Sequence, residues 1–139
     1  MNINLLGPVA ALTAFLSVWF GHVAVRKIEF HSRTIGLPAA AFAIAGLAIE
    51  FFSLKTSSFL LSTALGILGI TLLFDAFEFI RQQKRIIKGH APANPNNPRH
   101  ARFMREYTSA TDLDLLKRDP IGKPVSGGST QTDLLNTDY

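Results

Sequence analysis

Three long apolar stretches constrain this chain more than any other feature of its sequence. Residues 3–25 carry no formal charge, residues 35–54 contain a single acidic residue, Glu50, near their end, and the run that begins at 59 is uncharged to 74. An α-helix rises about 1.5 Å per residue, so a helix of about 20 residues crosses a hydrocarbon core of roughly 30 Å. The sequence therefore predicts an all-α membrane protein whose three transmembrane helices span about residues 3–25, 35–54 and 57–80.

The third helix is expected to continue beyond the membrane. Helical periodicity persists through charged residues to about Lys88, and Gly89 then precedes the proline-rich stretch HAPANPNNP, which cannot continue a helical hydrogen-bond ladder. This division predicts a transmembrane domain over residues 1–88 and an extended basic tail over 89–139. The first span lacks the basic leading region and cleavage site of a signal peptide, so we expect it to be retained.

The distribution of lysine and arginine predicts the orientation of the spans. No such residue precedes the first span, three follow it, one (Lys55) separates the second and third spans, and four lie between 81 and 88. Because short cytoplasmic flanks carry the excess of basic residues, the N-terminus is expected outside and the tail in the cytoplasm.

The composition favours an anionic lipid surface as a partner and excludes sites that need cysteine. The net charge is +4, and ten of the fourteen basic residues lie beyond Ile80, where an anionic lipid surface would attract them. Nucleic acid is not expected, because the aromatic residues that would stack on bases lie mostly in the spans. The absence of cysteine excludes disulfides and thiolate sites. We expect lipid or partner contacts from the basic residues Arg81, Arg85, Lys88, Arg99, Arg102 and Arg105.

Helix association in lipid depends on small residues and shared polar contacts, and the spans supply both. Small residues recur at helical spacing in each span, and we expect them to form the packing faces. They are Ala10, Ala14, Ser17 and Gly21 in the first span, Ala41, Ala45, Ala48 and Gly46 in the second, and Gly66 and Gly69 in the third.

A group of polar residues is expected near the inner ends of the spans: His22, Glu29, His31, Asp75 and Glu78. One interpretation is a metal or proton site, because histidine and carboxylates bind divalent ions and relay protons at membrane depth. The spacing is not specific for a metal. The more common arrangement is ion pairing of the two carboxylates on the third helix with Arg26, Lys27 or Arg81.

Evidence for an enzyme is missing from the sequence. One histidine lies inside a span, whereas haem ligation between helices needs two, and no G-x-S-x-G nucleophile motif is present. We therefore expect no catalytic, cofactor-binding or metal-binding residues and no cofactor. Within the tail, the segment from Arg99 combines bases with Phe103, Met104 and Tyr107, a pattern that suits a short amphipathic helix lying on the membrane or on a partner.

Two local patterns resemble a family of small bacterial membrane proteins known as domain of unknown function 4491. The first is His22-Val-Ala-Val-Arg-Lys-Ile-Glu-Phe30 after the first span. The second runs from Glu78 through Lys88-Gly89 to Pro92-Ala-Asn-Pro95. The resemblance covers roughly residues 3–97 and implies three spans in a bacterial inner membrane, with no assigned activity. Position 75, an aspartate here, and His90-Ala91 depart from the family pattern.

These observations favour a non-catalytic integral membrane subunit or assembly factor of a larger membrane complex, such as an energy-converting or electron-transfer complex. Its partners would be membrane lipids and other membrane protein subunits. The alternative is a small homo-oligomeric ion or proton transporter or channel that uses Asp75, Glu78 and His22.

Overall fold

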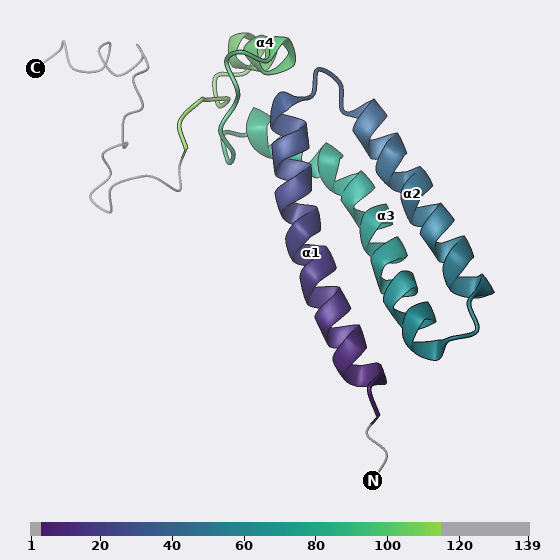
Figure 1. The fold of residues 1–139 in the computed structure, drawn as a ribbon. Helices are drawn as coiled ribbons and strands as arrows, with labels where there is room; N and C mark the ends of the chain where they lie inside the picture. The colour runs from purple at the N-terminus through teal and green to yellow at the C-terminus, as the bar shows by residue number, and fades with distance from the viewer. Residues whose placement is uncertain (1–3, 115–139) are drawn as a thin grey trace, which may run out of the picture.

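The computed structural model describes residues 4–114, which form four α-helices and no strand (Figure 1). The helices are α1 (Leu6–His31), α2 (Gly36–Lys55), α3 (Phe59–Ile87) and α4 (Pro98–Glu106). The first three are long and apolar enough to cross a membrane. The expectation of an all-helical protein with three such helices is confirmed for this part of the chain.

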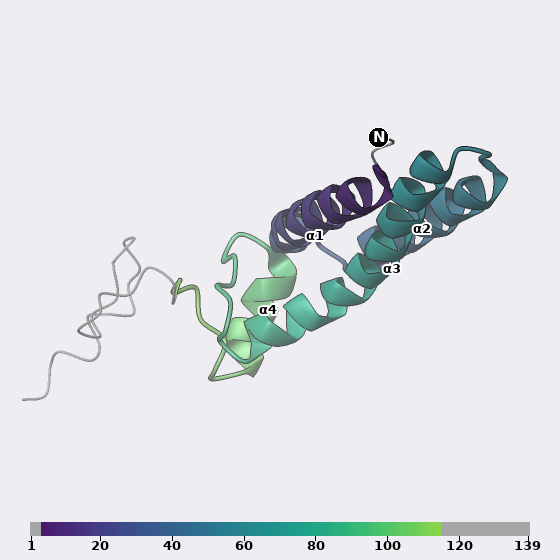
Figure 2. The same ribbon diagram turned by 90° about the horizontal axis from the view of Figure 1, so that it is seen from below.

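Helix α3 lies in the middle of the arrangement. Helices α1 and α2 each pack along α3, whereas these two outer helices hardly contact each other (Figures 1 and 2). The result is an open row of three helices and not a closed bundle. Most large apolar side chains of the row, such as Phe15, Ile44 and Phe74, are exposed, as expected of surfaces that face lipid.

Helices α2 and α3 approach each other through glycine and serine. A Cβ atom added to Gly46 would lie 2.9 Å from the backbone oxygen of Gly69, so only glycine allows this separation. About two turns further along α2, Ser53 Oγ donates to Ser62 O at 2.9 Å and Ser62 Oγ donates to Ser53 O at 3.1 Å. These reciprocal bonds hold the end of the α2–α3 hairpin together without any charged group.

The predicted packing face of α2 requires a correction. Ala41, Ala45 and Ala48 are exposed, and the buried residues of α2 are Gly46 and Ser53. Lipid tails are as apolar as the alanine row, so its spacing gave no energetic reason to choose that face. Backbone approach at Gly46 and the hydroxyl pair with Ser62 are available only on the other face.

Helix α3 ends in a Schellman motif. Gly89 has φ +71°, its N–H donates to Ile86 O at 3.0 Å, and the N–H of His90 donates to Arg85 O at 2.8 Å. These are the two bonds that define the motif, and the left-handed conformation favours glycine. A Cβ atom at position 89 would also collide with the backbone oxygen of Ser109. The motif turns the chain back towards the ends of α1 and α3.

Residues 90–114 differ from the extended tail that the prolines predict. Helix α4 forms within them, and Phe103, which is 3% exposed, packs with Ile86, Ala91 and Ala93 in a small apolar core. The N–H of Ala93 donates to Thr111 O at 2.8 Å, which ties the two ends of the segment together. Proline has no backbone N–H to donate, but other backbone N–H groups of this segment donate to its own side chains: Asn94 N to His100 Nδ1, Asn96 N to Asn94 Oδ1 and Arg99 N to Asn97 Oδ1. The remainder of the predicted tail, 115–139, lies outside the described residues.

Candidate functional site

The folded segment meets α1 at a buried carboxylate. Glu29, in the last turn of α1, is 0% exposed, and its Oε1 lies 2.8 Å from Arg99 Nη2 and 3.2 Å from His100 Nε2. Arg99 Nη2 also donates to the backbone oxygen of Glu29 at 2.9 Å, and Nη1 donates to Gln83 Oε1 of α3 at 3.1 Å. One guanidinium therefore joins α1, α3 and α4.

The hydrogen bonds of His100 determine its tautomer. Its Nδ1 accepts from the backbone N–H of Asn94 at 2.9 Å, so the proton of the neutral ring is on Nε2 and points towards Glu29. The ring is fully buried and stacks near Phe103, with ring centroids 6.1 Å apart. The positive partner of the Glu29 carboxylate is therefore Arg99, and His100 adds a neutral hydrogen bond.

Two asparagines complete the end of α1. The last carbonyl groups of a helix have no partner within it. Here Phe30 O accepts from Asn94 Nδ2 and from Asn97 Nδ2, both at 3.1 Å, and Ser32 O accepts from Asn97 Nδ2 at 2.9 Å. Asn97 is also the N-cap of α4, since its Oδ1 accepts from Arg99 N at 3.1 Å. The end of one helix is thus capped by the residue that begins another.

We call this set the docking cluster. It consists of Glu29, Asn94, Asn97, Arg99 and His100. Glu29 belongs to α1, and the other four members come from the tail. Each of these four bonds to a residue of α1 that lies more than 60 positions earlier in the sequence.

The position of Arg99 corrects the expectation that it contacts lipid or a partner. Its side chain is 10% exposed and is held by Glu29, because a buried carboxylate needs a positive partner at hydrogen-bond distance. Other predicted contact residues are exposed. Arg81 and Arg85 pair with Glu78 at 3.6 and 2.7 Å, and Arg102 pairs with Glu106 at 3.6 Å. Lys88 and Arg105 are exposed as well.

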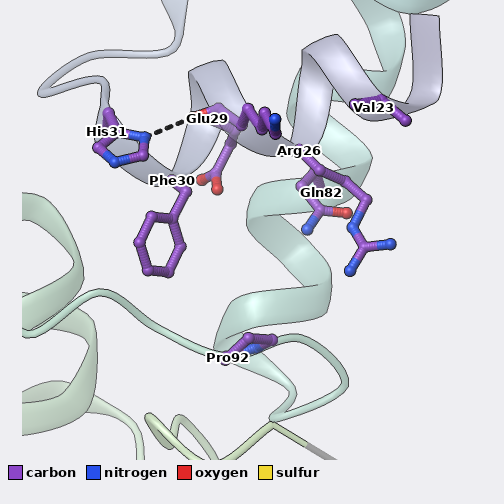
Figure 3. Close-up of a pocket in the computed structure, with 8 residues that line it drawn as sticks. Val23, Arg26, Glu29, Phe30, His31, Gln82 and Pro92 are labelled. Atoms are coloured by element: carbon purple, nitrogen blue, oxygen red, sulfur yellow. Dashed lines mark hydrogen bonds between the residues drawn. The ribbon is translucent and has the colours of Figure 1, made fainter. Parts of the chain in front are cut away.

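The five polar residues predicted at the inner ends do not all meet at one site, although His22 and Glu78 lie near Asp75. Glu29 belongs to the docking cluster, and Glu78 pairs with arginines of its own helix. His31 is exposed, and its Nδ1 lies 2.8 Å from Lys27 O, the bond drawn in Figure 3. His22 is exposed on α1. Among residues 4–114, no group of three histidines and carboxylates is arranged to hold a metal ion.

Asp75 is the exception to the predicted ion pairing. It is 4% exposed in α3, and its Oδ2 has no hydrogen-bond partner among the described residues. The carboxylate packs on Gly21 of α1, where any side chain would collide with it. It lies at one end of a cavity of about 370 Å³ that also contains Ser17 and Thr71, whose hydroxyl oxygens are 3.3 Å apart.

The sequence offered little indication of the docking cluster. A proline- and asparagine-rich stretch is typical of a solvated loop, so nothing local marks Asn94, Asn97 or His100 as site residues. A signal was nevertheless present. The two patterns that carry the family resemblance contain Glu29-Phe30 and Asn94, and the structure brings these residues into contact. The presence of both family patterns in one chain was therefore the one indication that residues of the first pattern contact residues of the second.

Comparison with known proteins agrees with this architecture. A family model described as Domain of unknown function (DUF4491) matches residues 4–97. The match includes Glu29, Asn94 and Asn97 and ends before Arg99 and His100. No curated protein and no solved structure matches the chain.

Proposed function

Since the chain belongs to the family described as Domain of unknown function (DUF4491), whose description carries no activity, we propose a function from the geometry. The protein is a non-catalytic integral membrane subunit or assembly factor of a larger membrane complex. We propose an energy-converting or electron-transfer complex as the host.

The observation that carries this proposal is how the polar groups at the tail end are used. Glu29 of α1 is held by Arg99 and His100 of α4, which connects two helices, and Glu78 is paired with Arg85 within α3. These carboxylates therefore serve internal contacts instead of lining an open site. The row of α1, α3 and α2 also lacks the closed wall that a transport path would need within one copy. Both features suit a rigid structural element.

The exposed alanine row of α2 supports a partner within the membrane. Ala41, Ala45 and Ala48 are exposed on one side of α2 while the opposite side packs on α3. Small residues at this spacing let a second helix approach closely. We assign this face to another membrane protein subunit and the remaining apolar faces to lipid.

We also propose the orientation and location of the chain. The N-terminus lies outside and the docked tail lies in the cytoplasm, because seven of the eight basic residues that flank the spans lie at the tail end. The membrane is the inner membrane of a bacterium. Labelling of single cysteines at Asn4 and Thr108 in intact cells tests this orientation: a membrane-impermeant reagent should modify position 4 only.

The sequence contains no cysteine, so an introduced cysteine is the only thiol that a cross-linker can modify. A single Ala45→Cys variant, expressed at its natural level and treated with a thiol-reactive cross-linker, should form an adduct with a companion protein that mass spectrometry identifies. Ala11→Cys, an exposed alanine on α1, is the matched control and should give less of that adduct. Purification of the native protein as a monomer or homodimer, with no companion and no adduct, would refute the proposal.

A second candidate is a homo-oligomeric ion or proton channel or transporter, which Asp75 favours. An unpaired buried carboxylate beside two hydroxyl groups is an expected element of a proton or cation path. In that case Asp75→Asn and Glu78→Gln should abolish flux into liposomes and leave assembly intact. Wild-type liposomes without flux would eliminate this candidate.

A further inference from the structure

A basic cavity lies where the docked tail covers the ends of α1 and α3. It has a volume of about 260 Å³, and its lining includes Arg26 and His22 of α1, Gln82 and Arg85 of α3, and His90 of the tail. Asp114 also lines it. Two arginines and one aspartate give the lining a formal charge of +1 with both histidines neutral. Arg85 is also paired with Glu78 at 2.7 Å, so Arg26 is the main cationic group that a ligand would meet.

The arginines retain donors for a ligand. Among residues 4–114 the Arg26 side chain has no hydrogen bond or ion pair, whereas Asp114, which lines the same cavity, has a partner of its own. Arg85 uses Nη1 for both Glu78 and Gln82, so within residues 4–114 its Nη2 and Nε have no partner. Figure 3 shows the Arg26 side chain extending from α1 beside Gln82. A guanidinium fork with free donors matches the oxygen atoms of a phosphate group.

An apolar groove continues from this cavity along α1. His22 lines the cavity and also lines a groove of about 480 Å³ formed by Ala14, Phe15, Val18 and Trp19. These groove residues belong to the apolar run of α1, which is long enough to cross a membrane. A ligand that occupies both places must have an anionic head and a hydrocarbon chain.

We propose that the cavity binds the headgroup of an anionic phospholipid, with an acyl chain in the α1 groove. The cavity is smaller than the roughly 300–1,000 Å³ of sites that enclose a drug-sized ligand, which suits a headgroup whose chain lies outside. Basic pockets at the ends of transmembrane helices are known to recognise anionic headgroups. The docked tail is part of the site, because His90 and Pro92 close one side of it.

Native mass spectrometry of the full chain in detergent, titrated with phosphatidylglycerol or phosphatidylcholine, tests this site. Wild-type protein should bind one phosphatidylglycerol in preference to phosphatidylcholine. Arg26→Gln should weaken that binding about tenfold, the usual effect of losing a hydrogen bond between charged groups. Because Arg26 has no described partner, the variant should retain the wild-type melting midpoint. Arg33→Gln, the same charge change in the exposed α1–α2 loop, should alter binding less than about twofold.

The outcomes separate a lipid site from general charge attraction. Equal loss in Arg26→Gln and Arg33→Gln, or no preference for phosphatidylglycerol, would overturn the proposal. Displacement of the lipid by millimolar inorganic phosphate would show that the groove contributes nothing and that the ligand is a free anion. Trp19→Ala should weaken lipid binding, and an unchanged affinity would remove the groove from the site.

Discussion

Removal of the Arg99 guanidinium should release the tail from the bundle. In an Arg99→Met variant the side chain keeps most of its length but loses its donors, and the Glu29 carboxylate remains buried with His100 as its partner. Breaking a buried ion pair by removing one partner costs about 3–5 kcal/mol. Because Arg99 is 10% exposed, we take the lower end, about 3 kcal/mol, which corresponds to a roughly hundredfold larger undocked population.

A cysteine at position 93 reports this population. Ala93 is 2% exposed in the small core under α4, so Ala93→Cys should react with a thiol reagent only when the segment opens. In membranes, Arg99→Met on this background should raise the labelling rate roughly a hundredfold. Arg102→Met is the matched control, because Arg102 is 61% exposed and its pair with Glu106 contributes little. A rate within about twofold of the parent for Arg99→Met would refute the assignment of Arg99 as the residue that holds the tail.

Three further predictions concern backbone and capping. Gly89→Ala should raise the same labelling rate by the equivalent of about 2 kcal/mol, because alanine disfavours φ +71° and its Cβ meets Ser109; an unchanged rate would contradict the Schellman turn. Asn97→Ala should cost about 2 kcal/mol in that assay, since it uncaps both α1 and α4, and a smaller effect than Arg102→Met would exclude this role. Gly46→Ala should lower the thermal midpoint in detergent, whereas Gly36→Ala, with open space around its Cβ, should not; equal midpoints would show that α2 and α3 can separate without cost.

The helices themselves could be predicted from sequence, because a long uncharged run has few alternatives in or near a membrane. Their faces could not. An apolar side chain has a similar free energy against lipid and against another helix, so the alanine row of α2 does not indicate which side of α2 packs on α3. Gly46 and Ser53 decide it through backbone approach and hydroxyl bonds, which depend on atoms of α3.

The docking cluster was hidden for a different reason. Arg99 resembles Arg102 and Arg105 in sequence, and only the presence of Glu29, 70 residues earlier, makes it turn inward. Asn94 and Asn97 belong to a stretch whose composition is typical of loops, and their role as caps requires the end of α1 to be nearby. Local propensity contains neither fact, so the tail was predicted to be extended.

The separation of Glu29 from its partner also has a consequence for synthesis. Ribosomes add roughly 5–20 residues per second, so the 70 residues between Glu29 and Arg99 take about 4–14 s to make. During that interval two further helices must enter the membrane. The end of α1 then has a carboxylate without its positive partner and carbonyl groups without hydrogen-bond donors. Water or a translocation factor has to solvate them until Asn94, Asn97 and Arg99 emerge. Helix α1 is therefore synthesised first, but the hydrogen bonds at its end form last.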